Sequence, residues 1–203
     1  MCYYIGMKRN FDKLMTSQIN SAPDKSKRLL LHCCCAPCSS ACLERLKDYF
    51  RITVLFYNPN IEDNEYGRRK AELIRFVRAT GWAEILDCDH DTDEFYSRVK
   101  GLESCPEGGE RCLKCFEMRL EKTAEIAASG EFDYFTTTLT ISPLKDAGAI
   151  NAIGERLGGD RWLYSDFKKQ NGYLRSIQLS KEFELYRQDY CGCLFSERTR
   201  SKT

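Results

Sequence analysis

Cysteine is the residue type through which this sequence could do chemistry. The chain has 203 residues and 12 cysteines, a density below that of short secreted disulfide scaffolds. No apolar segment has the length of a signal-peptide core or of a membrane span. We therefore expect a cytoplasmic protein without a membrane partner, in which reduced thiols serve metal binding or redox chemistry.

The first group of cysteines lies in the segment His32–Cys38, with the sequence HCCCAPC. Neighbouring side chains on a strand point to opposite faces, so part of this segment has to be a turn, which Pro37 favours. Gathered thiolates suit a soft metal ion or a metal cluster. The alternative is that two of these thiols are ordinary core residues and only one or two are ligands.

The second group is Cys112 and Cys115, in the sequence RCLKC at the start of a predicted helix. A C-x-x-C pair at a helix N-terminus places two thiols one turn apart. Alone, such a pair fits zinc, an iron–sulfur cluster or a redox dithiol. Together with the first group it offers four thiolates from two loops, a number that suits zinc and [4Fe–4S] equally.

The third group is Cys191 and Cys193, separated only by Gly192. This spacing is too short for comfortable tetrahedral zinc coordination, but glycine lets the chain bend enough for a disulfide. Such a small ring is strained and easily reduced, so it could store and hand on two electrons. The alternative is a pair of unrelated thiols.

The segments around these cysteines alternate between strand-like and helix-like patterns, which predicts an α/β fold with a parallel sheet and right-handed crossovers. In such sheets, sites lie at the carboxyl ends of strands, and the first cysteine group directly follows the first predicted strand. The expected strands are residues 28–33, 51–57, 82–88 and 131–138. The expected helices are one that begins at about residue 39, then residues 65–80, 111–129, 142–157 and 181–190, so that the C-terminal half is mainly helical.

The chain divides into a polar N-terminal arm or short helix over residues 1–27, a single α/β domain over 28–197, and a basic tail over 198–203. Basic residues exceed acidic ones in residues 1–28 and 164–203, whereas residues 62–110 carry thirteen acidic and seven basic residues. Two basic ends around an acidic middle fit a polyanion that touches part of the surface. Simple solvation of the termini would produce the same pattern.

The order of the motifs resembles that of the epoxyqueuosine reductases of the QueH type. The resemblance covers about residues 28–197. The motifs that carry it are His32–Cys38 (HCCCAPC), Arg111–Leu120 (RCLKCFEMRL), Phe132–Pro143 (FDYFTTTLTISP), Asp166–Lys169 (DFKK) and Tyr186–Cys193 (YRQDYCGC).

This resemblance implies a parallel sheet like that of the HUP nucleotide-binding proteins, with flanking helices. It implies the last step of queuosine biosynthesis, in which epoxyqueuosine in the anticodon loop of tRNA loses its epoxide oxygen. It also implies an electron donor, which the sequence does not identify. The site residues that it implies are a [4Fe–4S] cluster on Cys34, Cys35, Cys112 and Cys115, and a redox-active pair of Cys191 and Cys193. A second metal ion, iron or another, lies beside the cluster in some members, and Cys38 stands where those members can have an Asp.

Two further sets of residues are candidates for roles around the substrate. An anticodon loop is held by aromatic stacking and phosphate contacts. The aromatic and basic residues that could supply these contacts are Tyr164, Phe167, Lys168, Lys169, Tyr173 and Arg175. The alternative is that the same residues form a solvated loop whose aromatic side chains belong to the core. Candidate proton donors are Asp146, Asp166 and Asp189.

Two rival functions use the same residues differently. A zinc-stapled tRNA-binding protein would be colourless and would not need Cys191 and Cys193. A HUP-type tRNA thiolation enzyme would need a glycine-rich phosphate loop after the first strand. Cys33–Cys38 occupies that place without a glycine, which argues against ATP binding.

Overall fold

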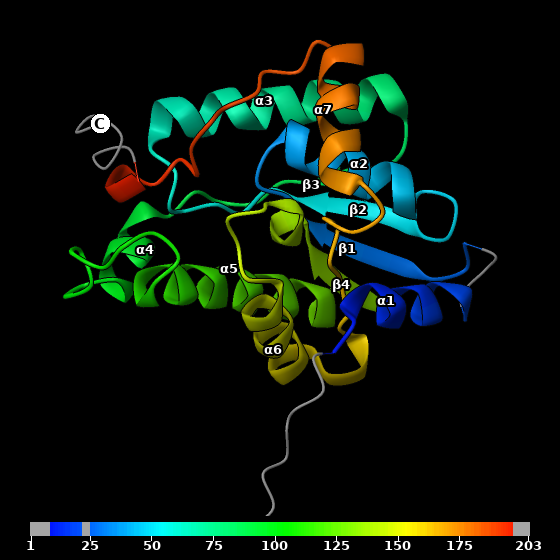
Figure 1. The fold of residues 1–203 in the computed structure, drawn as a ribbon, viewed down its shortest axis with the longest axis horizontal. Helices are drawn as coiled ribbons and strands as arrows, with labels where there is room; N and C mark the ends of the chain where they lie inside the picture. The colour runs from blue at the N-terminus through cyan, green and yellow to red at the C-terminus, as the bar shows by residue number, and fades with distance from the viewer. Residues whose placement is uncertain (1–8, 22–24, 197–203) are drawn as a thin grey trace, which may run out of the picture.

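A four-stranded, fully parallel sheet forms the centre of the molecule, with strand order β3-β2-β1-β4 (Figure 1). The computed structural model describes residues 9–21 and 25–196, so the predicted basic tail over 198–203 lies outside the described residues. The strands are β1 (Arg28–His32), β2 (Arg51–Leu55), β3 (Glu84–Leu86) and β4 (Tyr134–Thr137). The predicted α/β fold with a parallel sheet is thereby confirmed.

The order of the strands fixes where a site can lie. The chain runs outward from β1 to β2 and β3, and then returns to place β4 on the other side of β1. The connections after β1 and β4 therefore diverge at the carboxyl ends of these two neighbouring strands. In open α/β sheets, ligands bind at such a switch point, and Cys33–Cys38 begins there.

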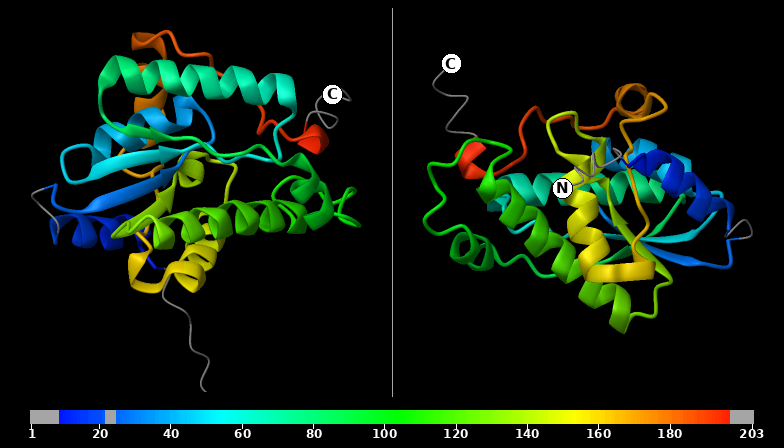
Figure 2. Two further views of the ribbon diagram at one scale, coloured as in Figure 1. Left: turned by 180° about the vertical axis from the view of Figure 1, so that it is seen from behind. Right: turned by 60° about the horizontal axis from the view of Figure 1, so that its bottom comes forward.

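Helices cover both faces of the sheet (Figure 2). Alternate residues of β1 point to opposite faces, as expected for a strand buried on both sides. Leu29 and Leu31 join one core, whereas Leu30 joins the other. The helices are α1 (Phe11–Asn20), α2 (Ala36–Leu46), α3 (Asp63–Thr80), α4 (Thr92–Arg98), α5 (Glu110–Ser129), α6 (Ala147–Gly158) and α7 (Gly172–Glu182), with 3₁₀ turns η1 (Thr138–Ile141) and η2 (Gly159–Arg161).

These helices divide between the two cores. Helix α2 contacts both α3 and α7 on one side, and α5 and α6 pack together on the other. Helix α1 lies within the predicted N-terminal arm, and it buries Met15 and Ile19 in the first core. No helix among residues 9–21 and 25–196 combines the length and the apolar character that crossing a bilayer requires.

The helix predicted over residues 181–190 is wrong. Ser180 is not a helix N-cap, because its hydroxyl donates to the carbonyl of Ser176 inside α7. Helix α7 ends at Glu182, and the chain reverses at Glu184, whose φ of 51° lies in the left-handed region. Residues 183–190 then run as an irregular segment toward Cys191, and this segment becomes one wall of the site.

Other elements also differ from the sequence expectation, and β2 (Arg51–Leu55) and β4 (Tyr134–Thr137) are shorter than the predicted 51–57 and 131–138. The third strand is only Glu84–Leu86, shorter than the predicted 82–88. Helix α6 begins at Ala147 rather than at residue 142, because the carboxylate of Asp146 caps it by accepting from the N–H groups of Gly148 and Ala149. Helix α4 was not predicted, although Asp91 caps it in the usual way.

Candidate metal and redox site

The tight turn after β1 brings three thiols together. The Sγ atoms of Cys34, Cys35 and Cys38 all lie within 4.8 Å of one another. Cys35 is the N-cap of α2, and its Sγ accepts a hydrogen bond of 3.4 Å from the backbone N–H of Cys38. The chain turns at Cys33–Cys35, whereas Pro37 lies in the first turn of α2, which begins at Ala36 rather than at about residue 39. Cys33 points away into the core, where it is fully buried.

The charges in this thiol group favour a cation. Hydrogen bonding with the thiols of Cys35 and Cys38 holds the pKa of Cys34 well below its usual range, and the charge of Lys145 lowers it further. Burial raises the pKa of Cys35 to about 12, and hydrogen bonding to Cys34 raises the pKa of Cys38. The three thiols therefore share protons through these hydrogen bonds, and Cys34 is the one most easily deprotonated. A soft metal ion would replace those shared protons, because thiolates are its preferred ligands.

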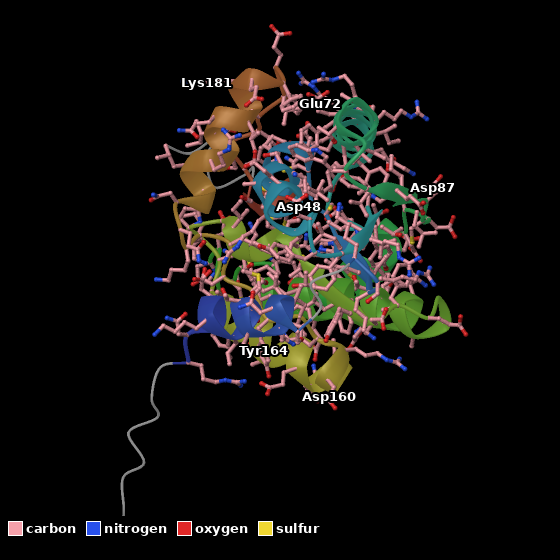
Figure 3. The ribbon with its side chains drawn as sticks, turned by 90° about the vertical axis from the view of Figure 1, so that its right-hand side faces the viewer. Asp48, Glu72, Asp87, Asp160, Tyr164 and Lys181 are labelled. Carbon is pink, nitrogen blue, oxygen red and sulfur yellow. The ribbon has the colours of Figure 1, made fainter. Side chains whose placement is uncertain are left out.

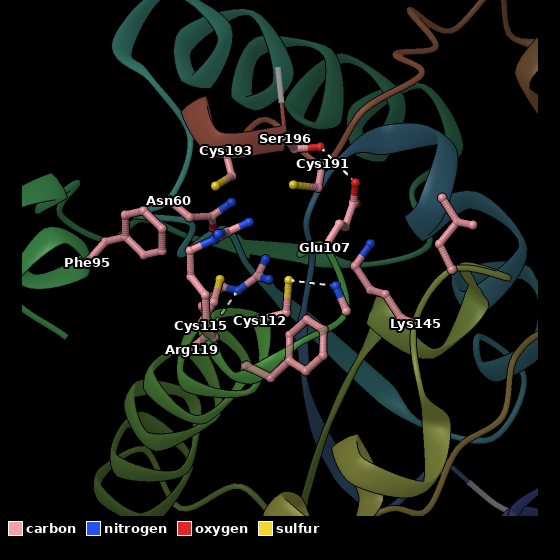
Figure 4. Close-up of a pocket in the computed structure, with 14 residues that line it drawn as sticks. Asn60, Phe95, Glu107, Cys112, Cys115, Arg119, Lys145, Cys191, Cys193 and Ser196 are labelled. Carbon is pink, nitrogen blue, oxygen red and sulfur yellow. Dashed lines mark hydrogen bonds between the residues drawn. The ribbon is translucent and has the colours of Figure 1, made fainter. Parts of the chain in front are cut away.

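The second cysteine group lies in the first two turns of α5. Gly109 is the N-cap of this helix, and the N–H of Gly108 donates to Cys112 Sγ at 3.2 Å. Cys112 and Cys115 line a small cavity together with Cys191 and Cys193, as Figure 4 shows. The structure thus brings the second and third cysteine groups face to face, although Cys112 and Cys115 are not part of the close group formed by Cys34, Cys35 and Cys38.

A second, larger cavity adjoins the first and contains Cys34 and Cys38 in its wall. Cys191 belongs to both cavities, so it lies between the other two cysteine groups. The remaining residues that line both cavities are Glu107, Arg119, Leu144, Lys145 and Ser196. All three predicted cysteine groups therefore meet at two adjoining cavities beside the carboxyl end of β1.

A buried arginine on α3 holds the third cysteine group in place. The guanidinium of Arg69 donates to the carbonyl oxygens of Cys191 at 3.0 Å and Tyr190 at 3.3 Å. It also pairs with Glu65 at 2.6 Å, and its side chain is only 2% exposed. Gly192 has a φ of 92°, and a Cβ there would lie 2.9 Å from Arg69 Nη1. Glycine is thus required at the point where the loop turns under Arg69.

The two thiols of this loop differ in their protonation. A hydrogen bond from the Cys193 thiol lowers the pKa of Cys191 to about 5. The same hydrogen bond raises the pKa of Cys193. A thiolate next to a protonated thiol is the arrangement from which a dithiol exchanges electrons through a disulfide, because the thiolate is the reactive form.

The smaller cavity has the features of a place for a bound soft metal group. Its donors are thiols, and the buried guanidinium of Arg119 and the ammonium of Lys145 line it and would offset thiolate charge. Asn60 is buried in the same wall, and its Oδ1 has no hydrogen-bond partner among the residues that the structure describes. A group bound here would complete this amide's environment. The residues thus fit a metal site.

Comparison with known proteins agrees with these features. The family model described as epoxyqueuosine reductase QueH matches residues 29–199. The chain belongs to the epoxyqueuosine reductase QueH family. A relative of that name from Streptococcus pyogenes is 41% identical over 94% of this chain and 79% of its own length. Relatives of the same name from Haemophilus influenzae and Thermotoga maritima are 44% and 34% identical over 89% and 83% of this chain, and 76% and 89% of their own lengths.

Membership of the QueH family confirms the family predicted from the five motifs, and with it an oxidoreductase enzyme. It favours this function over the zinc-stapled binding protein and the thiolation enzyme. The thiol group of Cys34, Cys35 and Cys38 agrees with the predicted metal binding.

The predicted aromatic and basic stretch does not form one surface. Tyr164 lies between α1 and α6 (Figure 3), where its hydroxyl bonds to Glu155 and accepts from Arg9. Phe167 is a core residue, and Arg175 pairs with Glu44. Tyr173 alone of these aromatic residues lines the larger cavity.

The three candidate proton donors lie in three different environments. Asp146 is a helix cap, Asp166 pairs with Lys168 at 3.2 Å, and Asp189 lines the larger cavity. Sequence reasoning missed Arg69 and Lys145, since they lie far along the chain from Cys191 and Cys34, which they approach. It also missed Glu107, which precedes Cys112 in the chain and lines both cavities with Cys191. Glu107 accepts a hydrogen bond from Ser196 at 3.1 Å, which joins the loop before α5 to the C-terminal segment (Figure 4).

Proposed function

We propose that this protein reduces the epoxide of epoxyqueuosine in the anticodon loop of tRNA to the alkene of queuosine. Family membership supports this function, and the observation that carries it in the structure is the meeting of three cysteine groups at two adjoining cavities. We place the reaction in the cytoplasm, where thiols stay reduced.

We infer that Cys34, Cys35, Cys112 and Cys115 hold a [4Fe–4S] cluster. The all-thiol donor set and the cationic side chains of Arg119 and Lys145 support this inference. The closeness of Cys38 to Cys34 and Cys35 favours a ligand role for Cys38 as well, toward a second metal ion. When bound, these groups would supply single electrons and polarise the epoxide oxygen.

The Cys191 and Cys193 pair can supply the electrons that the reaction consumes. Removal of the epoxide oxygen breaks two C–O bonds, forms a C=C bond, and requires two electrons and two protons for the water that leaves. A Cys191 thiolate and a Cys193 thiol that become one disulfide release the two required electrons and one proton, and the second proton comes from solvent. Cys191 lines both cavities, so this pair lies next to the other cysteines and to the larger opening. An external reductant must then restore the dithiol.

Changing Cys112 to Ser tests the proposed function. We expect the variant to lose the visible absorbance of the cluster and turnover of epoxyqueuosine-containing tRNA together. Cys88→Ser is the matched control, because Cys88 is a partly buried thiol packed against the second core and lines neither cavity. Normal turnover by the Cys112→Ser protein would refute the cluster assignment.

A further inference from the structure

The larger cavity has the size of a nucleoside-binding pocket. Its volume is about 540 Å³, within the range of roughly 300–1,000 Å³ that is common for small-molecule sites. Cys34, Cys38 and Cys191 lie in its wall, and so do the exposed side chains of Leu144 and Tyr173. A molecule in this cavity would therefore reach from the reactive thiols to the surface of the protein.

Gln188 belongs to the wall of this cavity and carries an unused hydrogen-bond acceptor. Its side-chain Oε1 is buried, and within the described part of the chain no donor reaches it. The neighbouring backbone is well fixed, because Arg69 binds the carbonyls of Tyr190 and Cys191. Loose packing of the segment therefore does not explain the unpaired oxygen. Buried polar atoms of native proteins are nearly always paired, so a bound ligand is the simplest partner.

Tyr173 and Arg187 provide a second recognition feature at the opening. The guanidinium of Arg187 lies over the ring of Tyr173, with its Cζ atom 5.3 Å from the ring centroid. The tyrosine is still 38% exposed, and nearby in the cavity wall Leu144 is 74% exposed. Exposed aromatic rings and guanidinium planes are the surfaces on which unstacked RNA bases are held.

We propose that the larger cavity is the nucleoside subsite of this enzyme, with Gln188 and Tyr173 as its recognition residues. Gln188 accepts a hydrogen bond from an N–H or O–H group of the modified nucleoside, while a base of the anticodon loop stacks on Tyr173. The epoxide-bearing ring then points toward Cys191, because that thiol lies in the same cavity wall. This assignment rests on the proposed function.

Gln188→Met tests the hydrogen bond, because it keeps the side-chain length and removes the acceptor. A structural glutamine would lose stability on this change. Gln188 in the proposed role should not, since an unpaired polar atom is removed, and the melting temperature should stay level or rise. We expect kcat/KM for epoxyqueuosine-containing tRNA to fall about tenfold or more, with unchanged iron and sulfide content.

The matched control is Gln178→Met, because Gln178 is an exposed glutamine on α7 whose Oε1 accepts a hydrogen bond from Arg175 at 3.4 Å. Gln178→Met should change neither the melting temperature nor kcat/KM. A kcat/KM of Gln188→Met within twofold of the unchanged enzyme would overturn the assignment. So would a lower melting temperature that accounts for the lost activity.

Tyr173→Ala tests the stacking contact without turnover. We expect the Kd for an anticodon stem–loop that carries epoxyqueuosine to rise about tenfold, and Tyr173→Phe to preserve it. Tyr49→Ala is the control, because Tyr49 is similarly exposed at 36% but precedes β2, at the opposite end of the sheet. Equal affinities of the two alanine variants would refute the subsite. If the unchanged protein binds the stem–loop but leaves the epoxide intact, the proposed function fails while this comparison still decides the subsite.

Discussion

Among the side chains of α3, Arg69 should contribute most to holding the loop that carries Cys191 and Cys193. Its guanidinium is 2% exposed, pairs with Glu65, and donates to two carbonyl oxygens of the segment 190–191. Changing Arg69 to Met removes these contacts and leaves the largely buried carboxylate of Glu65 without its cation. We expect this change to weaken the fold and to free the Cys191–Cys193 loop.

The size of the effect follows from the burial of the pair. Removal of one partner of a buried ion pair costs about 3–5 kcal/mol, because the remaining charge is left unpaired. The two hydrogen bonds to carbonyls are part of that figure rather than additions to it, since measured contributions in one network are not additive. For a domain of this size, each kcal/mol lowers the melting temperature by about 2–4 °C. The expected shift is therefore roughly 6–20 °C.

Arg75→Met is a closely matched control on the same helix. Arg75 also pairs with a glutamate of α3, Glu72, at 2.8 Å, and donates to the carbonyls of Phe183 and Glu184. Its side chain is 49% exposed, however, so its loss should cost less than about 1 kcal/mol. Denaturant unfolding of the metal-loaded proteins under anaerobic conditions measures the free energy of unfolding that each variant loses. Equal losses for the two variants would show that burial of Arg69 does not set its contribution.

Three other changes probe the cysteine groups. Cys191→Ser should keep the colour of the cluster but slow multiple turnover, and an unaffected steady-state rate would remove the proposed electron-relay role. Cys38→Ala should lower the metal content per chain, whereas Cys42→Ala, which removes a buried thiol outside the close group, should leave it unchanged; equal metal content in both would exclude Cys38 as a ligand. Gly192→Ala should destabilise the fold by about 1–2 kcal/mol or more, because a φ of 92° strains any residue with a Cβ and that atom would lie 2.9 Å from Arg69 Nη1 and Ile61 Cγ1; unchanged denaturant unfolding would contradict the described loop conformation.

The sequence predicted those parts of the site that depend on neighbouring residues. The strand β1, the break after it and the start of α5 are each set by local patterns, so the positions of Cys34 to Cys38 and of Cys112 to Cys115 followed directly. The alternation of strands and helices also predicted a parallel sheet with its site at a carboxyl edge. The parallel sheet is confirmed, and the first cysteine group lies at the carboxyl end of β1 as predicted.

Contacts between distant segments could not be predicted in the same way. Arg69 is one of several charged residues in an amphipathic helix, and nothing in its neighbourhood shows that it binds carbonyls at 190 and 191. The boundary of α7 was missed because Ser180 is a common capping residue, whereas the reversal at Glu184 depends on a left-handed backbone that glutamate seldom adopts. The unpaired oxygen of Gln188 appears only when every neighbour of that side chain is known.

Whether this chain removes the epoxide oxygen with a cysteine-bound iron–sulfur cluster can be decided on one anaerobically purified sample. Its visible spectrum and its iron, sulfide and zinc contents should be measured first, and the same sample should then be mixed with a reductant and tRNA that carries epoxyqueuosine. We expect a brown protein that contains iron and sulfide, and conversion of epoxyqueuosine to queuosine in the digested tRNA, seen by mass spectrometry as loss of one oxygen atom. A colourless zinc protein, or a protein with a full cluster that leaves the epoxide unchanged, would contradict the proposed function.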